Sequence, residues 1–383
     1  MKIKIIALAI AGLASGAALA QSQSNVTVYG VGDVSDVYAS DNYTPGTKSM
    51  NAIQSGSASL NGSRFGFKGT EDIGNGLSAN FRMEGGINMD TGTSAQGGQL
   101  MGRWATVGLT SQTLGTVEGG RRDTFQDQLL AAASGNARNT IAQNSPVYND
   151  TNRYNNFVAY LSPVWGGLQL KAGYSSNATT DQAVSQDVVP TQITTVADNI
   201  AASSNLRVYT AAVHYVNGPL LIGAAYDYNK LQSRDAVAGI DGTYNAGNVW
   251  NIAGAYDFGV VRVDAAFGMI NYAENTQASI KEDKDSRKQW ALGVVVPFGA
   301  NDRIMMNYTS AKISYLKDGA KDDSMHLWGL NYMHDLSKRT TVYASFAKIN
   351  QDGTFTNSKN MASLSGTGTG YQQGLQVGLR HSF

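Results

Sequence analysis

Basic side chains occupy alternate positions in several apolar segments, a spacing that gathers them on one side of an extended chain. Arg64 precedes Phe65, and Arg82 lies between Phe81 and Met83. Since successive side chains of a strand point to opposite faces, each arginine faces away from its apolar neighbours. Guanidinium groups on one wet wall attract anions and orient dipolar solutes. The spacing therefore predicts a surface that attracts small anions and orients dipolar solutes.

Parity relative to outward apolar neighbours assigns five basic residues to this wall: Arg64, Arg82, Arg122, Arg153 and Lys171. Arg103 fits badly, because it shares its parity with Val107 and Leu109. Either a bulge intervenes there, or those two residues line the channel or a subunit contact. Arg121 also has the outward parity.

The segment from Asp123 to Asp150 is longer and more apolar than a simple surface connection. Thr124, with Asp127 three positions later, predicts a capped helical turn or two. Folded inward, the segment would narrow a channel; the alternative is an outer loop with a local helix on the rim. In the inward arrangement the acids expected opposite the bases are Glu118, Asp123 and Asp127.

Bond-making chemistry has little support in the sequence. The histidines, His214, His326, His334 and His381, have no Asp or Ser partner in a recognisable local arrangement, although a triad can converge from distant positions. The chain has no cysteine, which excludes a thiolate metal site and a disulfide framework. We expect no catalytic residue, no metal site and no cofactor.

The elements that must position the basic residues are strands. LQLKAGYSS, which begins at Leu168, alternates apolar and polar residues, and so does the terminal GLQVGLRHSF. The longest apolar stretch after the N-terminal segment, Ala291 to Phe298, has eight residues, too few for a membrane-spanning helix. A closed sheet crosses a bilayer with strands of about ten residues. An antiparallel sandwich with a dry core shows the same alternation and is the alternative.

Short and long connections alternate along the chain, which favours the barrel. The seven short ones carry residues typical of tight turns: 72–76, 112–116, 162–167, 217–218, 258–259, 298–302 and 335–339. The eight longer, polar ones are approximately 39–55, 91–97, 123–150, 177–204, 232–246, 274–286, 316–322 and 351–370. Fifteen connections join sixteen strands. The predicted fold is all-β, a 16-stranded antiparallel transmembrane β-barrel with short periplasmic turns, long extracellular loops and the third loop in the lumen.

The N-terminus predicts export. Lys2 and Lys4 precede an apolar stretch and small residues that end at Ala20, the layout of a cleaved signal peptide over 1–20. The barrel then occupies 21–383 without a domain boundary. Without the two lysines, 27 of the 29 basic residues remain against 29 acidic ones, a balance that argues against a nucleic-acid partner.

Five segments in this order resemble Gram-negative general porins of the betaproteobacterial and neisserial type. They are NVTVYGVGDV (25–34), SRFGFKGTEDIGNGLSANFRME (63–84), RWATVGLTSQTLGTVEGGRR (103–122), YLSPVWGGLQLKAGY (160–174) and GLRHSF (378–383). The resemblance implies a homotrimer of outer-membrane barrels that passes small hydrophilic solutes and ions by diffusion. It maps constriction arginines to Arg64, Arg103 and Arg153, which adds Arg103 to the basic wall. It also implies that the strand ending at Phe383 is read by the barrel-assembly machinery and pairs with residues 26–38.

The expected function is a general porin that weakly favours anions. The alternative is an outer-membrane channel selective for a sugar or a small organic anion, which would show a ladder of aromatics or a denser basic track. Acidic loop clusters could bridge divalent ions to lipopolysaccharide or be merely solvated. Aromatic residues near strand ends are expected to form girdles at the membrane interfaces, among them Tyr29, Tyr160, Trp165, Tyr256, Trp290, Phe298, Trp328, Tyr332 and Phe383.

Overall fold

The computed structural model describes residues 25–42, 49–55, 59–134, 140–142, 153–178, 205–235, 240–271, 284–315, 321–352 and 371–383. The expected signal peptide, residues 1–20, lies outside the described residues. So do most of the predicted loops 177–204, 274–286 and 351–370.

The described chain is almost entirely strand, with one helix, α2 (Phe125–Ala133). The strands in chain order are β1 (Asn25–Asn42), β2 (Met50–Ser55), β3 (Arg64–Gly74), β4 (Leu77–Asn88), β5 (Thr93–Ser94), β6 (Trp104–Ser111), β7 (Gly115–Asp123), β8 (Arg153–Leu161), β9 (Leu168–Ser175), β10 (Asn205–Asn217), β11 (Leu220–Asp235), β12 (Ile240–Asp257), β13 (Arg262–Asn271), β14 (Lys284–Phe298), β15 (Asp302–Tyr315), β16 (Asp323–Asp335), β17 (Thr340–Asp352) and β18 (Tyr371–Ser382).

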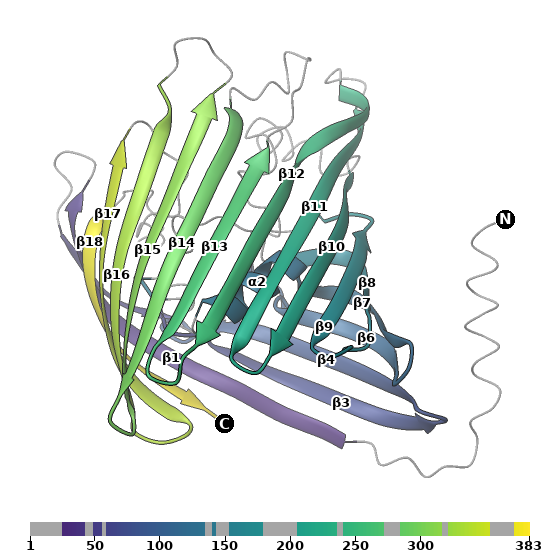
Figure 1. Cartoon of the computed structure of the whole chain (residues 1–383), viewed down its shortest axis with the longest axis horizontal. Coiled ribbons are helices and arrows are strands. Elements are labelled where there is room, and N and C mark those ends of the chain that lie inside the picture. Colours follow the sequence, from purple (N-terminus) through teal and green to yellow (C-terminus); the bar gives the residue numbers. More distant parts are fainter. Residues whose placement is uncertain are drawn as a thin grey trace.

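Sixteen of these strands form a closed antiparallel ring, with the short β2 and β5 as additions (Figure 1). Residues Val31–Asn42 of β1 pair with Tyr371–Ser382 of β18, and the backbone N–H groups of Gly30 and Phe383 each donate to the other's carbonyl at 3.1 Å. Closure leaves no free sheet edge and satisfies the backbone without water. The predicted barrel is confirmed, the terminal strand pairs close to the expected residues, and the sandwich is wrong.

The seven predicted short turns are confirmed, each joining two consecutive ring strands. Two predicted loops are wrong in part. Residues 39–55 include the end of β1 and all of β2, which pairs with Val34–Ala39. Residues 232–246 are mostly strand, because β11 continues to Asp235 and β12 begins at Ile240. These stretches are polar, yet the hydrogen-bond ladder needs only extended backbone and continues through them.

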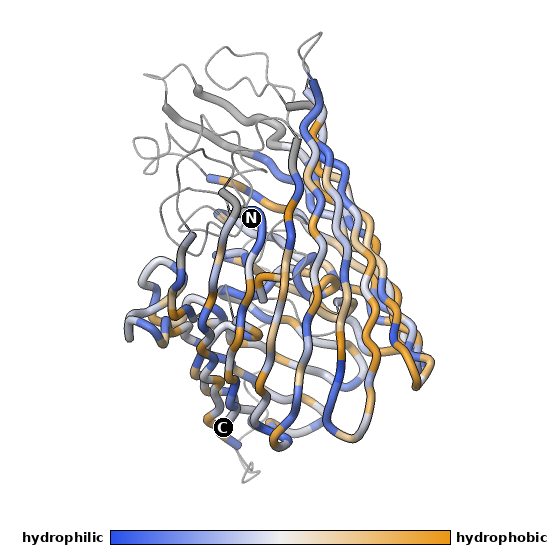
Figure 2. The backbone as a smooth tube through the Cα atoms, turned by 90° about the vertical axis from the view of Figure 1, so that its left-hand side faces the viewer, coloured by the Kyte–Doolittle hydropathy of each residue, from blue (hydrophilic) through white to orange (hydrophobic). Residues whose placement is uncertain are grey.

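The two faces of the strands differ as the alternation predicts. Leu379 is 50% exposed, whereas Gln376, on the other face of β18, is 1% exposed. Figure 2 shows apolar and polar residues alternating along the strands. Exposed aromatics on the outer face include Tyr160, Trp165, Tyr256, Trp290, Phe298, Trp328, Tyr332 and Phe383. Tyr29 is an exception, because its hydroxyl donates to Glu84 on the inner face at 2.9 Å.

Candidate channel constriction

Helix α2 is held against the inner wall. Thr124 caps it as expected: its hydroxyl accepts the N–H of Asp127 at 3.0 Å. Phe125 and Leu129 are fully buried, in a cluster that includes inward residues of β10 to β12. The Gln126 amide donates to the Val249 carbonyl at 3.1 Å and accepts from Asn251 at 2.6 Å. The helix therefore lies inside the barrel.

A second described part of the same segment, residues 140–142, reaches another sector of the inner wall. The Thr140 hydroxyl donates to Asn331 on β16 at 2.8 Å, and the Ile141 N–H donates to the Gln376 side chain on β18 at 3.1 Å. Ile141 is buried in an apolar cluster with residues such as Leu327. Residues 135–139 and 143–152 lie outside the described residues. The described parts of the segment thus contact two separate sectors of the lumen wall.

Glu84 is the acceptor around which three arginines of the basic wall converge. Its carboxylate lies 2.8 Å from Nη2 of Arg82, 2.7 Å from Nε of Arg103 and 3.8 Å from Nε of Arg64. Tyr29 adds its hydroxyl, and the Glu84 side chain is only 3% exposed. Sequence reasoning missed Glu84, although its parity matches that of Arg82.

The expected placement of the acids opposite the bases is wrong for two of them. Glu118 pairs with Arg122, four positions along the same strand, and Asp123 pairs with Arg153 at 2.8 Å on the adjacent strand. Both carboxylates therefore lie beside the arginines. Asp127 lies in the first turn of α2, where its backbone is engaged by the helix cap.

Arg103 escapes the parity rule because it precedes β6, which begins at Trp104. Its side chain reaches Glu84, so neither a bulge nor an inward Val107 is needed; Val107 is 67% exposed. Arg121 keeps its outward parity and donates to the Gly102 carbonyl at 2.7 Å and to Asn155. A register shift between β7 and β8 lies beside it, at Gly120 and Arg122.

Aromatic rings alternate with the cations along this wall. The Arg82 guanidinium carbon lies 5.9 Å from the Tyr29 ring centroid and 4.1 Å from that of Trp104. That of Arg122 lies 5.1 Å from Trp104 and 5.4 Å from Phe125. We call Tyr29, Arg82, Trp104, Arg122 and Phe125 the stacked series. Cations over ring faces are attracted by the ring quadrupole, so the series fixes the arginines in place.

A lysine flanks each end of the stacked series. Lys68 lies 5.5 Å from the Tyr29 ring centroid and Lys171 lies 5.8 Å from that of Phe125. The Lys171 ammonium also contacts the Gln128 amide at 3.1 Å and His214 at 3.2 Å. Lys171 is therefore connected to the basic wall by its contacts with α2. The arginines are connected to one another by the carboxylates and aromatic rings that they share.

Each of the four histidines contacts a different partner, and that of His214 is Lys171. His334 pairs with Asp302 at 2.8 Å, and Asp302 also accepts from Tyr332, which is 40% exposed on the outer face. His326 contacts Tyr308, and His381 contacts Thr340. Among the described residues, no three His, Asp or Glu side chains are grouped to hold a metal ion. No helix in the described ranges is long and apolar enough to cross a membrane.

Comparison with known proteins agrees with this architecture. The family model described as Gram-negative porin matches residues 7–354. An outer membrane porin protein of Bordetella pertussis is 31% identical over 89% of this chain and 93% of its own length. Outer membrane porin protein 32 of Delftia acidovorans is 28% identical, with both chains covered in full. Among solved structures, the anion-selective porin from Comamonas acidovorans superimposes with a TM-score of 0.69 at 23% identity, covering 94% of this chain and 100% of its own.

Proposed function

Because the chain belongs to the Gram-negative porin family, we propose that the basic wall makes its channel weakly selective for anions. The protein is a β-barrel of the outer membrane, and its general function is passive diffusion of ions and small hydrophilic solutes. Selectivity is the finer property. What supports it is a chain of contacts among six basic side chains: Glu84 joins Arg64, Arg82 and Arg103, Trp104 joins Arg82 and Arg122, Arg153 donates to the Arg103 carbonyl, and Lys171 lies over Phe125.

The charge balance of this wall supports an anion preference. The five arginines contact three carboxylates, those of Glu84, Glu118 and Asp123, and Lys171 contacts Gln128 and His214 instead, so the cluster keeps a positive excess. Such an excess raises the local concentration of anions. At physiological salt the Debye length is about 8 Å, so a wet wall acts only on solutes that pass close to it. A weak preference follows.

A second candidate is a channel selective for a small organic anion. The stacked series and its two flanking lysines form the kind of aromatic and basic track that such a channel requires. Arg82 retains about a third of its side-chain surface open to solvent, enough to contact a solute. The two candidates differ in kinetics: a general channel conducts in proportion to solute concentration, and a selective one saturates.

Several further properties are part of the proposal. The chain acts as a homotrimer without enzymatic activity, and it is exported by the signal peptide over 1–20. It contacts lipopolysaccharide and membrane lipid, and the barrel-assembly machinery reads the strand that ends at Phe383. The outward ring of that terminal residue and its backbone pairing with Gly30 support the last point. Sedimentation of the native protein in detergent tests the trimer.

The decisive experiment is the reversal potential of the purified protein in a planar bilayer with a tenfold salt gradient. We expect an anion-favouring potential, and we expect Arg82→Gln combined with Arg103→Gln to reduce it. Lys288→Gln is the matched control, since Lys288 is exposed on the outward face beside Trp290. A cation-favouring potential in the native protein refutes the selectivity. An effect of the control as large as that of the wall variants refutes the assignment of residues.

A further inference from the structure

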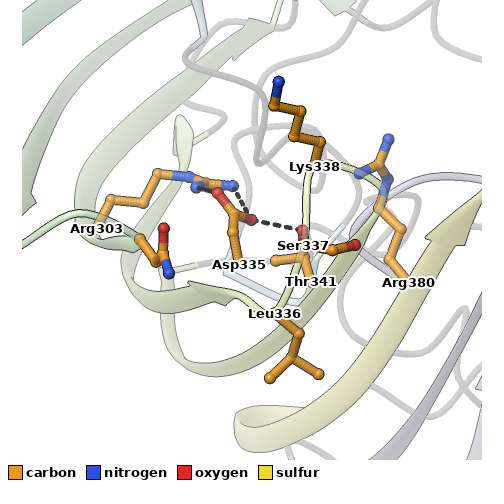
Figure 3. A pocket seen from close by; sticks show the side chains of 8 residues that line it. Arg303, Asp335, Leu336, Ser337, Lys338, Thr341 and Arg380 are labelled. Atoms are coloured by element: carbon orange, nitrogen blue, oxygen red, sulfur yellow. Dashed lines mark hydrogen bonds and ion pairs between the residues drawn. The ribbon is translucent and has the colours of Figure 1, made fainter.

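A second basic pocket lies at the short-turn end of the barrel, away from the stacked series. Its cavity measures about 510 Å³ and lies between two turns, the one before β15 and the one after β16. Figure 3 shows the charged side chains that line it: Arg303, Asp335, Lys338 and Arg380. In bacterial outer-membrane barrels the short turns face the periplasm. The pocket therefore occupies the inner mouth of the channel.

The pocket opens to the lumen, because its strand residues have inward parity. Asp335 pairs in register with Thr341, Thr341 with Arg380, and Arg380 with Asp33, which is fully buried on the inner face of β1. Cross-strand partners point to the same side of a sheet. Arg380 thus extends the basic lining from the constriction to the mouth.

Carboxylates in this pocket are already engaged. Asp335 accepts from Nη1 of Arg303 at 2.5 Å and from the Thr341 hydroxyl at 2.7 Å. Asp33, the register neighbour of Arg380, accepts from the Tyr343 hydroxyl at 2.7 Å and the Asn61 N–H at 2.6 Å. These contacts hold the two carboxylates in place. Both carboxylates also attract Arg380, and Lys338 adds a further positive charge to the pocket.

Arg380 has unsatisfied hydrogen-bonding capacity. Its Nε is buried and has no hydrogen-bond partner in the described part of the chain. A buried donor without a partner is costly, and a movement of the Arg380 side chain toward a ligand oxygen in the cavity would relieve the cost. Lys338 lies in the neighbouring turn, and in Figure 3 its side chain and that of Arg380 extend away from the Arg303–Asp335 pair. Two cations from separate elements can each take one carboxylate of the same solute.

We propose that this pocket is a binding station for small dicarboxylates at the inner mouth of the channel. The inference deepens the proposed anion preference and rests on it. Inorganic phosphate shares the oxyanion chemistry, but its oxygens surround a single atom, whereas the two separated carboxylates of a dicarboxylate suit two cations on different elements. A dicarboxylate can bridge Lys338 and Arg380. The pocket would therefore hold dicarboxylates in the channel for longer than other anions, and it would bind them from the short-turn side. The constriction alone makes the channel only weakly selective.

The test measures block of the chloride current by succinate, added to each side of a bilayer in turn. We expect saturable block of the native protein from the short-turn side. Lys338→Gln and Arg380→Gln should each raise the half-blocking concentration about tenfold, as expected for the loss of one charge-assisted hydrogen bond. Arg380→Lys keeps the positive charge, so its half-blocking concentration should lie between those of the native protein and Arg380→Gln. This result would show that the glutamine variant has lost a binding contact and has not misfolded. Phosphate, tested in the same way, should block more weakly.

Each result distinguishes the station from the proposed function. If both glutamine variants are blocked at the native succinate concentration, the station is refuted, even where the reversal potential still favours anions. Block by phosphate equal to that by succinate refutes the dicarboxylate assignment. If the native reversal potential favours cations, the proposed selectivity fails, whatever succinate does. Lys288→Gln, on the outward face, is again the matched control and should not change the block.

Discussion

Arg82 stacks on Trp104 with 4.1 Å between the guanidinium carbon and the ring centroid, while its Nη2 donates to Glu84 at 2.8 Å. One guanidinium thus satisfies a carboxylate at its edge and a ring at its face. Trp104 holds Arg122 in the same way at 5.1 Å. Trp104, an uncharged residue, therefore helps to hold two arginines of the basic wall in place. Its replacement should change the positions of these positive charges while the total charge of the channel stays the same.

Trp104→Leu should loosen the arginines while preserving the charge of the wall. Each cation–π contact contributes about 0.5–2 kcal/mol, so its loss should broaden the positions of Arg82 and Arg122. We expect noisier open-channel current with an unchanged sign of the reversal potential. Trp328→Leu is the control, because Trp328 is 57% exposed on the outer face. Equal noise in both variants would contradict a role for the stacked series.

Glu84→Gln should strengthen the anion preference and weaken the barrel. The substitution removes the carboxylate that Arg64, Arg82 and Arg103 share, so the positive excess of the wall rises. Leaving buried charged donors without an ionised acceptor costs about 1–3 kcal/mol or more. The reversal potential and the unfolding temperature of the purified protein check the two effects. Glu71→Gln, on an exposed part of β3, should change neither.

The sequence predicts the barrel well because alternation and turns are local signals. Strands such as β18 and all seven short turns depend on neighbours within a few residues. The Glu84 cluster was missed because most of its partners are distant in the chain: Arg103 is 19 residues away and Tyr29 is 55, and only Arg82 is a near neighbour. Arg103 itself misled the parity argument because parity holds only inside a strand. Whether an acid lies beside a base or across the lumen depends on register, which local pattern does not give.

Gly30→Val should impair closure of the barrel. A Cβ on Gly30 would lie 2.3 Å from the Phe383 ring, so a side chain there must displace the terminal aromatic residue. Gly32→Val is a matched control two positions along β1, where a Cβ meets only Met89 at 3.6 Å. We expect a lower yield of folded, heat-modifiable barrel for the first variant and a normal yield for the second. Equal yields would show that the position of the Phe383 ring is unimportant.

The absence of native cysteine makes the position of α2 directly testable. Gln126 on the helix and Asn251 on β12 are hydrogen-bonded at 2.6 Å, so cysteines at both positions should react with one short thiol-to-thiol cross-linker. Because α2 already rests on this wall, the cross-linked channel should keep its conductance. The control pair joins Asn251→Cys with Asn80→Cys on β4, away from the helix contact, and should not cross-link. If the loop lay on the outer rim, the first pair would not cross-link. If the loop moved through the lumen, cross-linking would abolish the current fluctuations that its movement causes.

Efficient cross-linking with unchanged conductance therefore identifies α2 as a fixed part of the channel wall. The open channel then lies between α2 and the basic wall.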